Sequence, residues 1–292
     1  MFYKINNLLV KSDIALFTER TSYIDQDFHL EIRSSSNIKP FDNLTTFVNK
    51  EIHYKDKNNI LFKITDGNLI EYSCDDSDKK YLPKEIMGLP LGYALFQKGF
   101  TVLHASSISH NNKGIIFSGL SGSGKSTIIS DLINKGFDYL SDDLVCLDNK
   151  NNLHSYTNTL AVQSIGKFTK QYFTEITTLN DKRKRSLYLH NKINKIPTPA
   201  KLCYFLKWGS KNDIYELKGV QLFEKIFPNL FREENFKGNQ IDKKLLRQRL
   251  IADVSNLSSL KCFLIERNLK ENSSFLHKIE KHIDSQMQNE EK

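Results

Sequence analysis

Cysteine is scarce in this sequence, and no two cysteines form the CxxC pair typical of zinc sites and redox motifs. The four residues are Cys74, Cys146, Cys203 and Cys262. Long apolar runs are also missing, since none approaches the ~20 residues needed to span a bilayer. Residues 1–10 lack the apolar core and the small-residue cleavage site of a signal peptide. We therefore expect a cytoplasmic protein without a membrane partner, a zinc site or a disulfide framework.

Basic residues outnumber acidic ones, 42 to 34, which gives a formal net charge of +8. Such an excess favours an anionic partner, such as a nucleotide, a nucleic acid or an acidic peptide. Lys, Asn and Ile are frequent along the whole chain, however, and no DNA- or RNA-binding signature is present. We therefore expect no nucleic-acid partner. Charged residues at 26% and hydrophobic residues at 39% are typical of a folded globular protein.

The first 82 residues contain short runs in which polar and apolar residues alternate, the pattern of half-buried strands. The runs are 3–10, 28–32, 60–65 and 69–72. Asp66-Gly67-Asn68 is a turn sequence that joins the last two runs as a hairpin. We predict a small antiparallel sheet, and treat 1–82 as a β-rich region ahead of a catalytic domain at 83–292.

From residue 83 the apolar residues take helical spacing, and strands then alternate with helices. An apolar helix surface ends near Gly99, and Gly136 predicts the end of a second helix that begins at Lys125. The expected strands are 101–109, 114–118, 137–140 and 202–207, and two more helices are expected at 241–256 and 273–287. Residues 180–196 have the composition of a basic loop.

Residues 119–126 read GLSGSGKS and fill every fixed position of the phosphate-binding motif GxxxxGK[ST], the P-loop or Walker A sequence. A glycine-rich turn ahead of a helix presents backbone N–H groups and the positive end of the helix dipole to phosphate. Lys125 would reach the terminal phosphates, and the Ser126 hydroxyl would coordinate Mg²⁺. The predicted nucleotide-binding residues are Gly119, Ser121, Gly122, Ser123, Gly124, Lys125, Ser126 and Thr127. A chance match in a loop is the alternative, which the complete motif and its flanks disfavour.

Two carboxylates, Asp142 and Asp143, follow the next expected strand after the P-loop helix. Adjacent side chains on an extended segment point in different directions, so one can contact the metal while the other faces an acceptor hydroxyl. A solvated turn is the alternative. His104 lies on the expected strand before the motif, where it is either a functional group or a hydrogen-bonded core histidine.

Residues 101–148 resemble the P-loop core of bacterial HPr kinase/phosphorylase and, more closely, its shorter relatives. These relatives include serine kinases that act on peptides, such as lasso peptide kinases. The order of histidine, strand, P-loop, helix and Asp-Asp is shared at matching spacing. The resemblance implies an α/β fold with a phosphoenolpyruvate-carboxykinase-like P-loop kinase core and a mixed sheet. It also implies phosphorylation of a serine hydroxyl with ATP and Mg²⁺.

The resemblance further implies that Asp142 is the general base and that Asp143, with Ser126, contacts the metal, although the two aspartates could exchange roles. It places His104 near the phosphates and gives Lys125 the phosphate role. A weaker similarity covers Lys182 and Arg183, which could clamp the transferring phosphate or an anionic acceptor. A solvated basic loop is the alternative for this pair.

One departure from the family concerns its later Arg-Gly-Leu-Gly-Ile motif, because residues 158–166 here read NTLAVQSIG. This argues against phosphorylase activity and against HPr as the acceptor. We expect an ATP-dependent serine kinase that acts on a serine-containing peptide or small acceptor, for example the precursor of a ribosomally made lasso-type peptide. The alternatives are a nucleotide-dependent regulatory or scaffold protein without transfer activity, and an HPr serine kinase. Formation of a homo-oligomer is left open.

Overall fold

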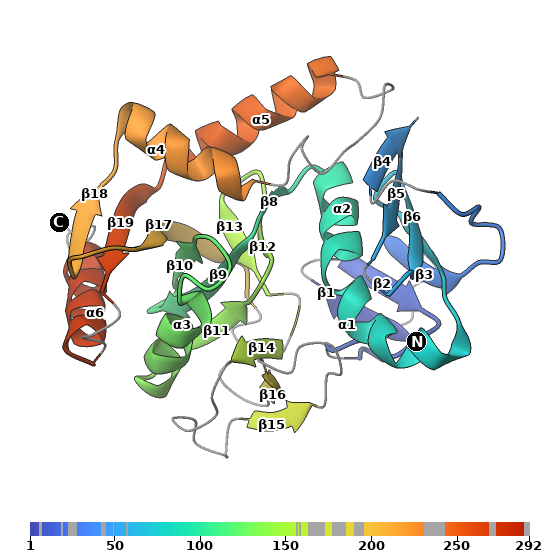
Figure 1. Cartoon of the computed structure of the whole chain (residues 1–292), viewed down its shortest axis with the longest axis horizontal. Coiled ribbons are helices and arrows are strands. Elements are labelled where there is room, and N and C mark those ends of the chain that lie inside the picture. Colours follow the sequence, from blue (N-terminus) through green and yellow to red (C-terminus); the bar gives the residue numbers. More distant parts are fainter. Residues whose placement is uncertain are drawn as a thin grey trace.

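The computed structural model of the chain contains a seven-stranded sheet, a nine-stranded sheet and a three-stranded sheet (Figure 1). The N-terminal sheet, with its helices, lies on one side of the molecule, and the large sheet lies on the other. The structure describes residues 1–5, 8–18, 20–22, 28–41, 45–48, 50–56, 58–155, 157, 159–162, 173–176, 185–189, 196–230, 243–268 and 273–288.

The N-terminal sheet contains the predicted hairpin, β6 (Leu61–Thr65) and β7 (Leu69–Ser73), with Asp66 and Gly67 at positive φ in the turn. Its strand order is β1-β2-β3-β7-β6-β5-β4. The other strands are β1 (Phe2–Ile5), β2 (Leu8–Ser12), β3 (Leu30–Ser34), β4 (Thr45–Val48) and β5 (Glu51–Lys55). Most pairs are antiparallel, as predicted, but β3 lies parallel to both β2 and β7. Alternating polarity identifies strands without fixing which strands pair, so this mixed order was not predictable.

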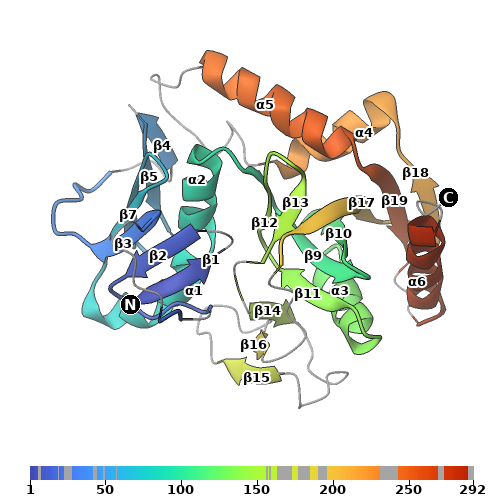
Figure 2. The same ribbon diagram turned by 180° about the vertical axis from the view of Figure 1, so that it is seen from behind.

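One face of this sheet is covered by the helices α1 (Leu82–Ile86) and α2 (Leu89–Gln97), which follow the short 3₁₀ helix η1 (Asp76–Tyr81) (Figure 2). Gly88 has a non-helical backbone between α1 and α2, so the apolar segment that ends near Gly99 is two helices. Both helices share one apolar core with the sheet, and Val102 and Cys146 also belong to it. The predicted boundary at residues 82 and 83 stays a prediction.

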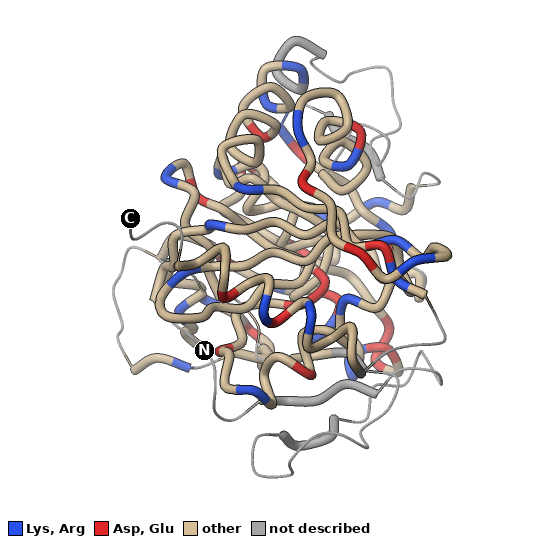
Figure 3. The backbone as a smooth tube through the Cα atoms, turned by 90° about the vertical axis from the view of Figure 1, so that its left-hand side faces the viewer, with Lys and Arg blue, Asp and Glu red and all other residues tan. Residues whose placement is uncertain are grey.

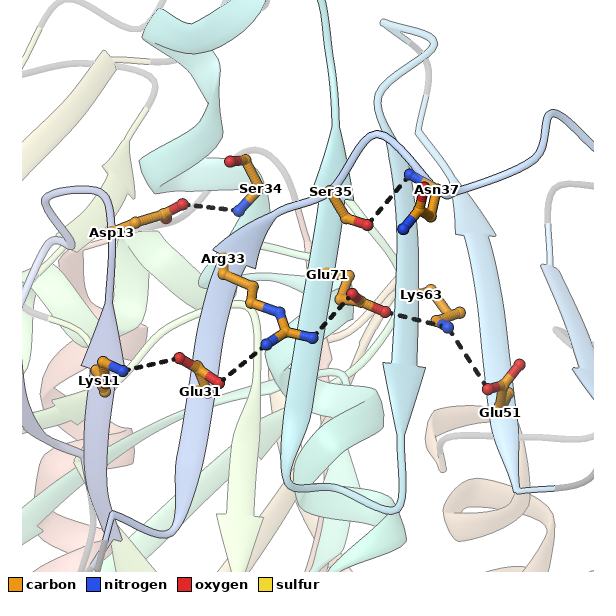
Figure 4. A network of polar contacts seen from close by, with 10 residues as sticks. All are labelled: Lys11, Asp13, Glu31, Arg33, Ser34, Ser35, Asn37, Glu51, Lys63 and Glu71. Carbon is orange, nitrogen blue, oxygen red and sulfur yellow. Dashed lines mark hydrogen bonds and ion pairs between the residues drawn. The ribbon is translucent and has the colours of Figure 1, made fainter. Parts of the chain in front are cut away.

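The opposite face of the N-terminal sheet carries a row of ion pairs across neighbouring strands (Figure 4). The row runs through Lys11, Glu31, Arg33, Glu71, Lys63 and Glu51. Successive members have opposite charge, so each carboxylate in the row lies between two cations or beside one. This sheet therefore has an apolar face against the helices and a charged face outside them.

The large sheet is mixed, as predicted, and follows the path β11-β9-β10-β17-β13-β12-β8, with β19 and β18 continuing from β17. Its strands are β8 (Thr101–Leu103), β9 (Ala105–His110), β10 (Lys113–Ser118), β11 (Asp138–Ser141), β12 (Val145–Leu147), β13 (Asn152–His154), β17 (Thr198–Trp208), β18 (Asp213–Glu216) and β19 (Lys261–Arg267). The expected single strand 101–109 is interrupted at His104. There the chain leaves β8, which pairs with β12, and enters β9, which pairs with β10 and β11.

Helices cover both faces of this sheet. On one face Ile115 and Phe117 of β10 pack with α3 (Lys125–Asn134) and α6 (Ser273–Gln288). On the other face Ile116 packs with α4 (Gly219–Ile226) and α5 (Lys243–Ser258). The 3₁₀ helix η2 (Phe227–Asn229) follows α4. A strand buried on both faces needs a continuous apolar run, which explains the sequence Ile115-Ile116-Phe117.

The three-stranded sheet, in the order β14-β16-β15, is formed by the part of the chain between β13 and β17 of the large sheet. It consists of β14 (Thr159–Val162), β15 (Phe173–Ile176) and β16 (Arg185–Leu189). The expectation of a loop over 180–196 was therefore wrong at β16, whose ladder to two partners gives it extended structure. Lys182 and Arg183 lie outside the described residues.

Charged residues of both signs are interspersed along the backbone in the view of Figure 3. Within the described ranges, no helix is both long and apolar enough to cross a membrane.

Candidate active site

The register of three neighbouring strands brings the predicted site residues to one edge of the large sheet. Strand β9 lies antiparallel to both β10 and β11, with Ala105 opposite Ser118 and Ser107 opposite Ser141. The carboxyl ends of β10 and β11 therefore meet the amino end of β9. This edge carries the start of the glycine loop after Ser118, His104 before β9, and the two aspartates after Ser141.

The glycine loop connects β10 to α3, in the strand–turn–helix order that the motif requires. Gly124 caps α3 with a left-handed backbone, φ 93°, and Gly122 has φ 83°. A side chain at either position would be strained, and a Cβ on Gly124 would also lie 2.2 Å from Nη1 of Arg267. The loop conformation is thus one that depends on glycine at these two positions.

Inside the loop, the side chain of Lys125 is held against the backbone and is only 7% exposed. Its Nζ donates hydrogen bonds to the carbonyl oxygens of Gly119, at 2.6 Å, and Leu120, at 3.4 Å. The buried Ser123 Oγ has no hydrogen-bond partner among the residues that the structure describes. A buried cation, an unsatisfied hydroxyl and the N-terminus of α3 together fit a bound phosphate group.

The remaining predicted nucleotide-binding side chains differ in exposure. Ser126 is partly buried in the first turn of α3, while Ser121 and Thr127 are exposed. Hydroxyl groups at the start of this helix thus lie beside the loop, as a ligand to a phosphate-bound Mg²⁺ would need to.

Asp142 and Asp143 occupy different environments at the end of β11. Asp142 is 4% exposed and its Oδ1 accepts a hydrogen bond of 2.5 Å from Ser106 Oγ. Asp143 is exposed and has a left-handed backbone, φ 67°, a conformation that Asp adopts more readily than most residues. Burial, and then the negative charges of both aspartates, raise the pKa of Tyr139 well above its ordinary value. The pair therefore makes this edge locally negative, beside the positive loop.

His104 lies between β8 and β9, and its side chain is exposed. The core-histidine alternative is therefore wrong. Its backbone is fixed on two sides, because its N–H donates to the carbonyl of Asn229 at 3.0 Å and its carbonyl accepts from Ser118 Oγ at 3.2 Å. The backbone is thus held against Ser118, the residue immediately before the glycine loop, and the side chain is exposed.

Two residues that no motif indicated also contact the loop. Trp208 Nε1 donates to the carbonyl of Gly122 at 2.9 Å, and Arg267 Nη1 donates to the carbonyl of Gly124 at 3.3 Å. They are register partners at the ends of the parallel strands β17 and β19. The only usable sequence signal was the expected strand 202–207, which ends one residue before Trp208.

No protein-family model matches the chain, and no curated protein matches it. Among solved structures, the chain is similar to the HPr(Ser) kinase/phosphatase from Coxiella burnetii. The two share 14% sequence identity, the alignment covers 65% of this chain and 92% of that chain, and the TM-score is 0.32. A likeness of this size indicates neither the family nor the reaction, which must be inferred from the site itself.

Proposed function

We propose that this protein is an ATP-dependent kinase that transfers the γ-phosphate to a serine hydroxyl of a peptide or small acceptor. One observation carries the proposal: the register of β9, β10 and β11 gathers the glycine loop, His104 and the aspartate pair at one sheet edge. A phosphate cradle and carboxylates on the same edge are the parts that phosphoryl transfer requires.

The nucleotide would be held by the backbone N–H groups of the loop, with Lys125 at the terminal phosphates. Ser126 and Asp143 would contact Mg²⁺, a hard cation that prefers oxygen ligands. When bound, MgATP supplies the transferable phosphoryl group and the positive charge of the metal. The exposed imidazole of His104 would hydrogen-bond to phosphate oxygens at the same edge.

Asp142 would act as the general base that accepts the proton of the acceptor hydroxyl. Its carboxylate is fixed by Ser106, which occupies Oδ1 as a hydrogen-bond donor. A carboxylate that is already fixed loses less conformational freedom when the substrate hydroxyl binds. Asp142 is therefore well placed to accept the proton of that hydroxyl. Exchange of the two aspartate roles is the alternative, and single substitutions distinguish the two assignments.

We infer a serine-containing peptide as the acceptor from the resemblance of residues 101–148 to short peptide-tailoring kinases. The precursor of a ribosomally made lasso-type peptide is the specific candidate. A cytoplasmic location belongs to the same proposal.

The test is to incubate the purified protein with γ-labelled ATP and Mg²⁺, with either a pool of serine-containing peptides or HPr. Label on a peptide serine, located by mass spectrometry, is the expected result. Label on HPr alone would make the protein an HPr serine kinase. Tight ATP binding by calorimetry without label on any acceptor would favour a nucleotide-dependent regulatory or scaffold protein.

A further inference from the structure

The glycine loop is held from outside by the ends of two strands that lie far from it in the sequence. Trp208, the single tryptophan of the chain, is 40% exposed and donates its indole N–H to the carbonyl of Gly122. Arg267 is 1% exposed, and its guanidinium lies 5.0 Å from the centre of the Trp208 ring. The same guanidinium donates to the carbonyl of Gly124. Each partner therefore holds one loop carbonyl, and the two partners hold each other.

Fixing these carbonyls also fixes the N–H groups of the next residues. In a planar trans peptide the C=O and the following N–H point in opposite directions. The Ser123 N–H shares a peptide with the Gly122 carbonyl and donates to Leu120 O at 3.0 Å, closing a turn. The Lys125 N–H shares a peptide with the Gly124 carbonyl and begins α3. Both N–H groups therefore point away from Trp208 and Arg267.

We propose that Trp208 is a positioning residue, which together with Arg267 holds the glycine loop in the conformation that binds phosphate. The role in binding rests on the proposed nucleotide site, whereas the effect on the loop itself does not. A free glycine-rich turn samples many backbone conformations, so an anchor that restricts them lowers the entropy lost when a ligand binds. The indole N–H, rather than the ring area, is the group that performs this role.

The test compares three variants by amide hydrogen exchange without nucleotide and by calorimetric titration with MgATP. Trp208→Phe removes the indole N–H and keeps an aromatic ring over Arg267, while Trp208→Leu removes both. Lys207→Gln is the matched control, because Lys207 is the preceding residue on β17, faces the opposite side of the sheet and pairs with Glu266 at 2.7 Å.

For Trp208→Phe we expect exchange in the peptide covering 119–128 to accelerate about threefold to tenfold, and the Kd for ATP to rise by a similar factor, as the loss of one hydrogen bond predicts. Lys207→Gln should change neither quantity.

Unchanged exchange and Kd in Trp208→Phe would overturn the proposal. If only Trp208→Leu weakens binding, the ring stacks on the base instead, which also overturns it. If the wild-type protein binds no ATP, the kinase proposal fails, and the exchange measurement still decides whether Trp208 orders the loop.

Discussion

The hydroxyl of Ser106 lies 2.5 Å from Oδ1 of Asp142, and both side chains are buried between neighbouring strands. The contact depends on an irregular register, because Tyr139 pairs with Ile108 while Ser141 already pairs with Ser107. A bulge of this kind inserts one extra residue and redirects the side chains that follow it. The carboxylate of Asp142 is thereby directed at Ser106.

Replacing Ser106 by alanine should lower kcat for serine phosphorylation about threefold to tenfold, since one hydrogen bond to the proposed base is lost. The Kd for ATP should stay within about twofold, because Ser106 contacts the base and not the loop. Steady-state kinetics and calorimetry measure the two quantities. Ser107→Ala is the control: this adjacent buried hydroxyl has no hydrogen-bond partner among the described residues. Equal kcat values for both variants would exclude a positioning role for Ser106.

Asp142→Asn and Lys125→Ala should have different kinetic effects. A carboxamide cannot accept the acceptor proton, so Asp142→Asn should lower kcat by about 10² to 10⁴ while ATP affinity stays near that of the wild type. Lys125→Ala removes a cation from the phosphate site, so it should weaken ATP binding by at least about tenfold and also reduce transfer.

Asp143→Asn provides the comparison for the two aspartates. As a metal contact, Asp143 should chiefly set the Mg²⁺ concentration required for half-maximal activity, which should rise in this variant. Titration of activity with Mg²⁺ measures the change. If Asp142→Asn shifts the Mg²⁺ requirement and Asp143→Asn abolishes transfer, the two roles are exchanged.

Gly124→Ala and Gly136→Ala separate backbone strain from loss of the loop anchor. Both glycines have positive φ, 93° and 104°, which costs an L-residue about 1 kcal/mol. Nothing lies within 4 Å of a Cβ on Gly136, whereas a Cβ on Gly124 collides with Arg267. Thermal unfolding should therefore show a moderate loss of stability for both variants, with ATP binding lost only in Gly124→Ala. Retained ATP binding in Gly124→Ala would mean that the close approach of Arg267 is dispensable.

Features set by neighbouring residues in the chain were predictable from the sequence. The helix from Lys125 was placed within one residue of its end, because Gly136 follows the helix in a left-handed conformation. The helices near 241–256 and 273–287 and the hairpin of β6 and β7 were also found. In each case a local signal, such as an apolar repeat or a turn glycine, marks the element.

Features set by pairing between distant segments were not predictable. Trp208 and Arg267 are 59 residues apart and become neighbours only through the register of β17 and β19. The contact between Ser106 and Asp142 likewise depends on a bulge in β11, and no residue type in the sequence marks its position. The exposure of His104 follows from the strand break, where the chain changes pairing partners. The sequence therefore indicates the residue types of the site but not the residues that hold them.

The charged face of the N-terminal sheet predicts a pH-dependent stability centred on Glu71 (Figure 4). Burial alone would raise the pKa of this carboxyl, but hydrogen bonds from Lys63 and Arg33 outweigh burial and lower it below its ordinary 4.5. A depressed pKa adds stability above pH 4.5 that is lost as the pH falls further. Glu71→Gln should therefore lower the unfolding free energy by about 1 kcal/mol at pH 7 and by less at pH 3. Denaturant titrations at both pH values measure this difference. Glu216→Gln, which breaks the exposed pair with Lys218, should have little effect at either pH, and an equal loss in the two variants would contradict the role of Glu71.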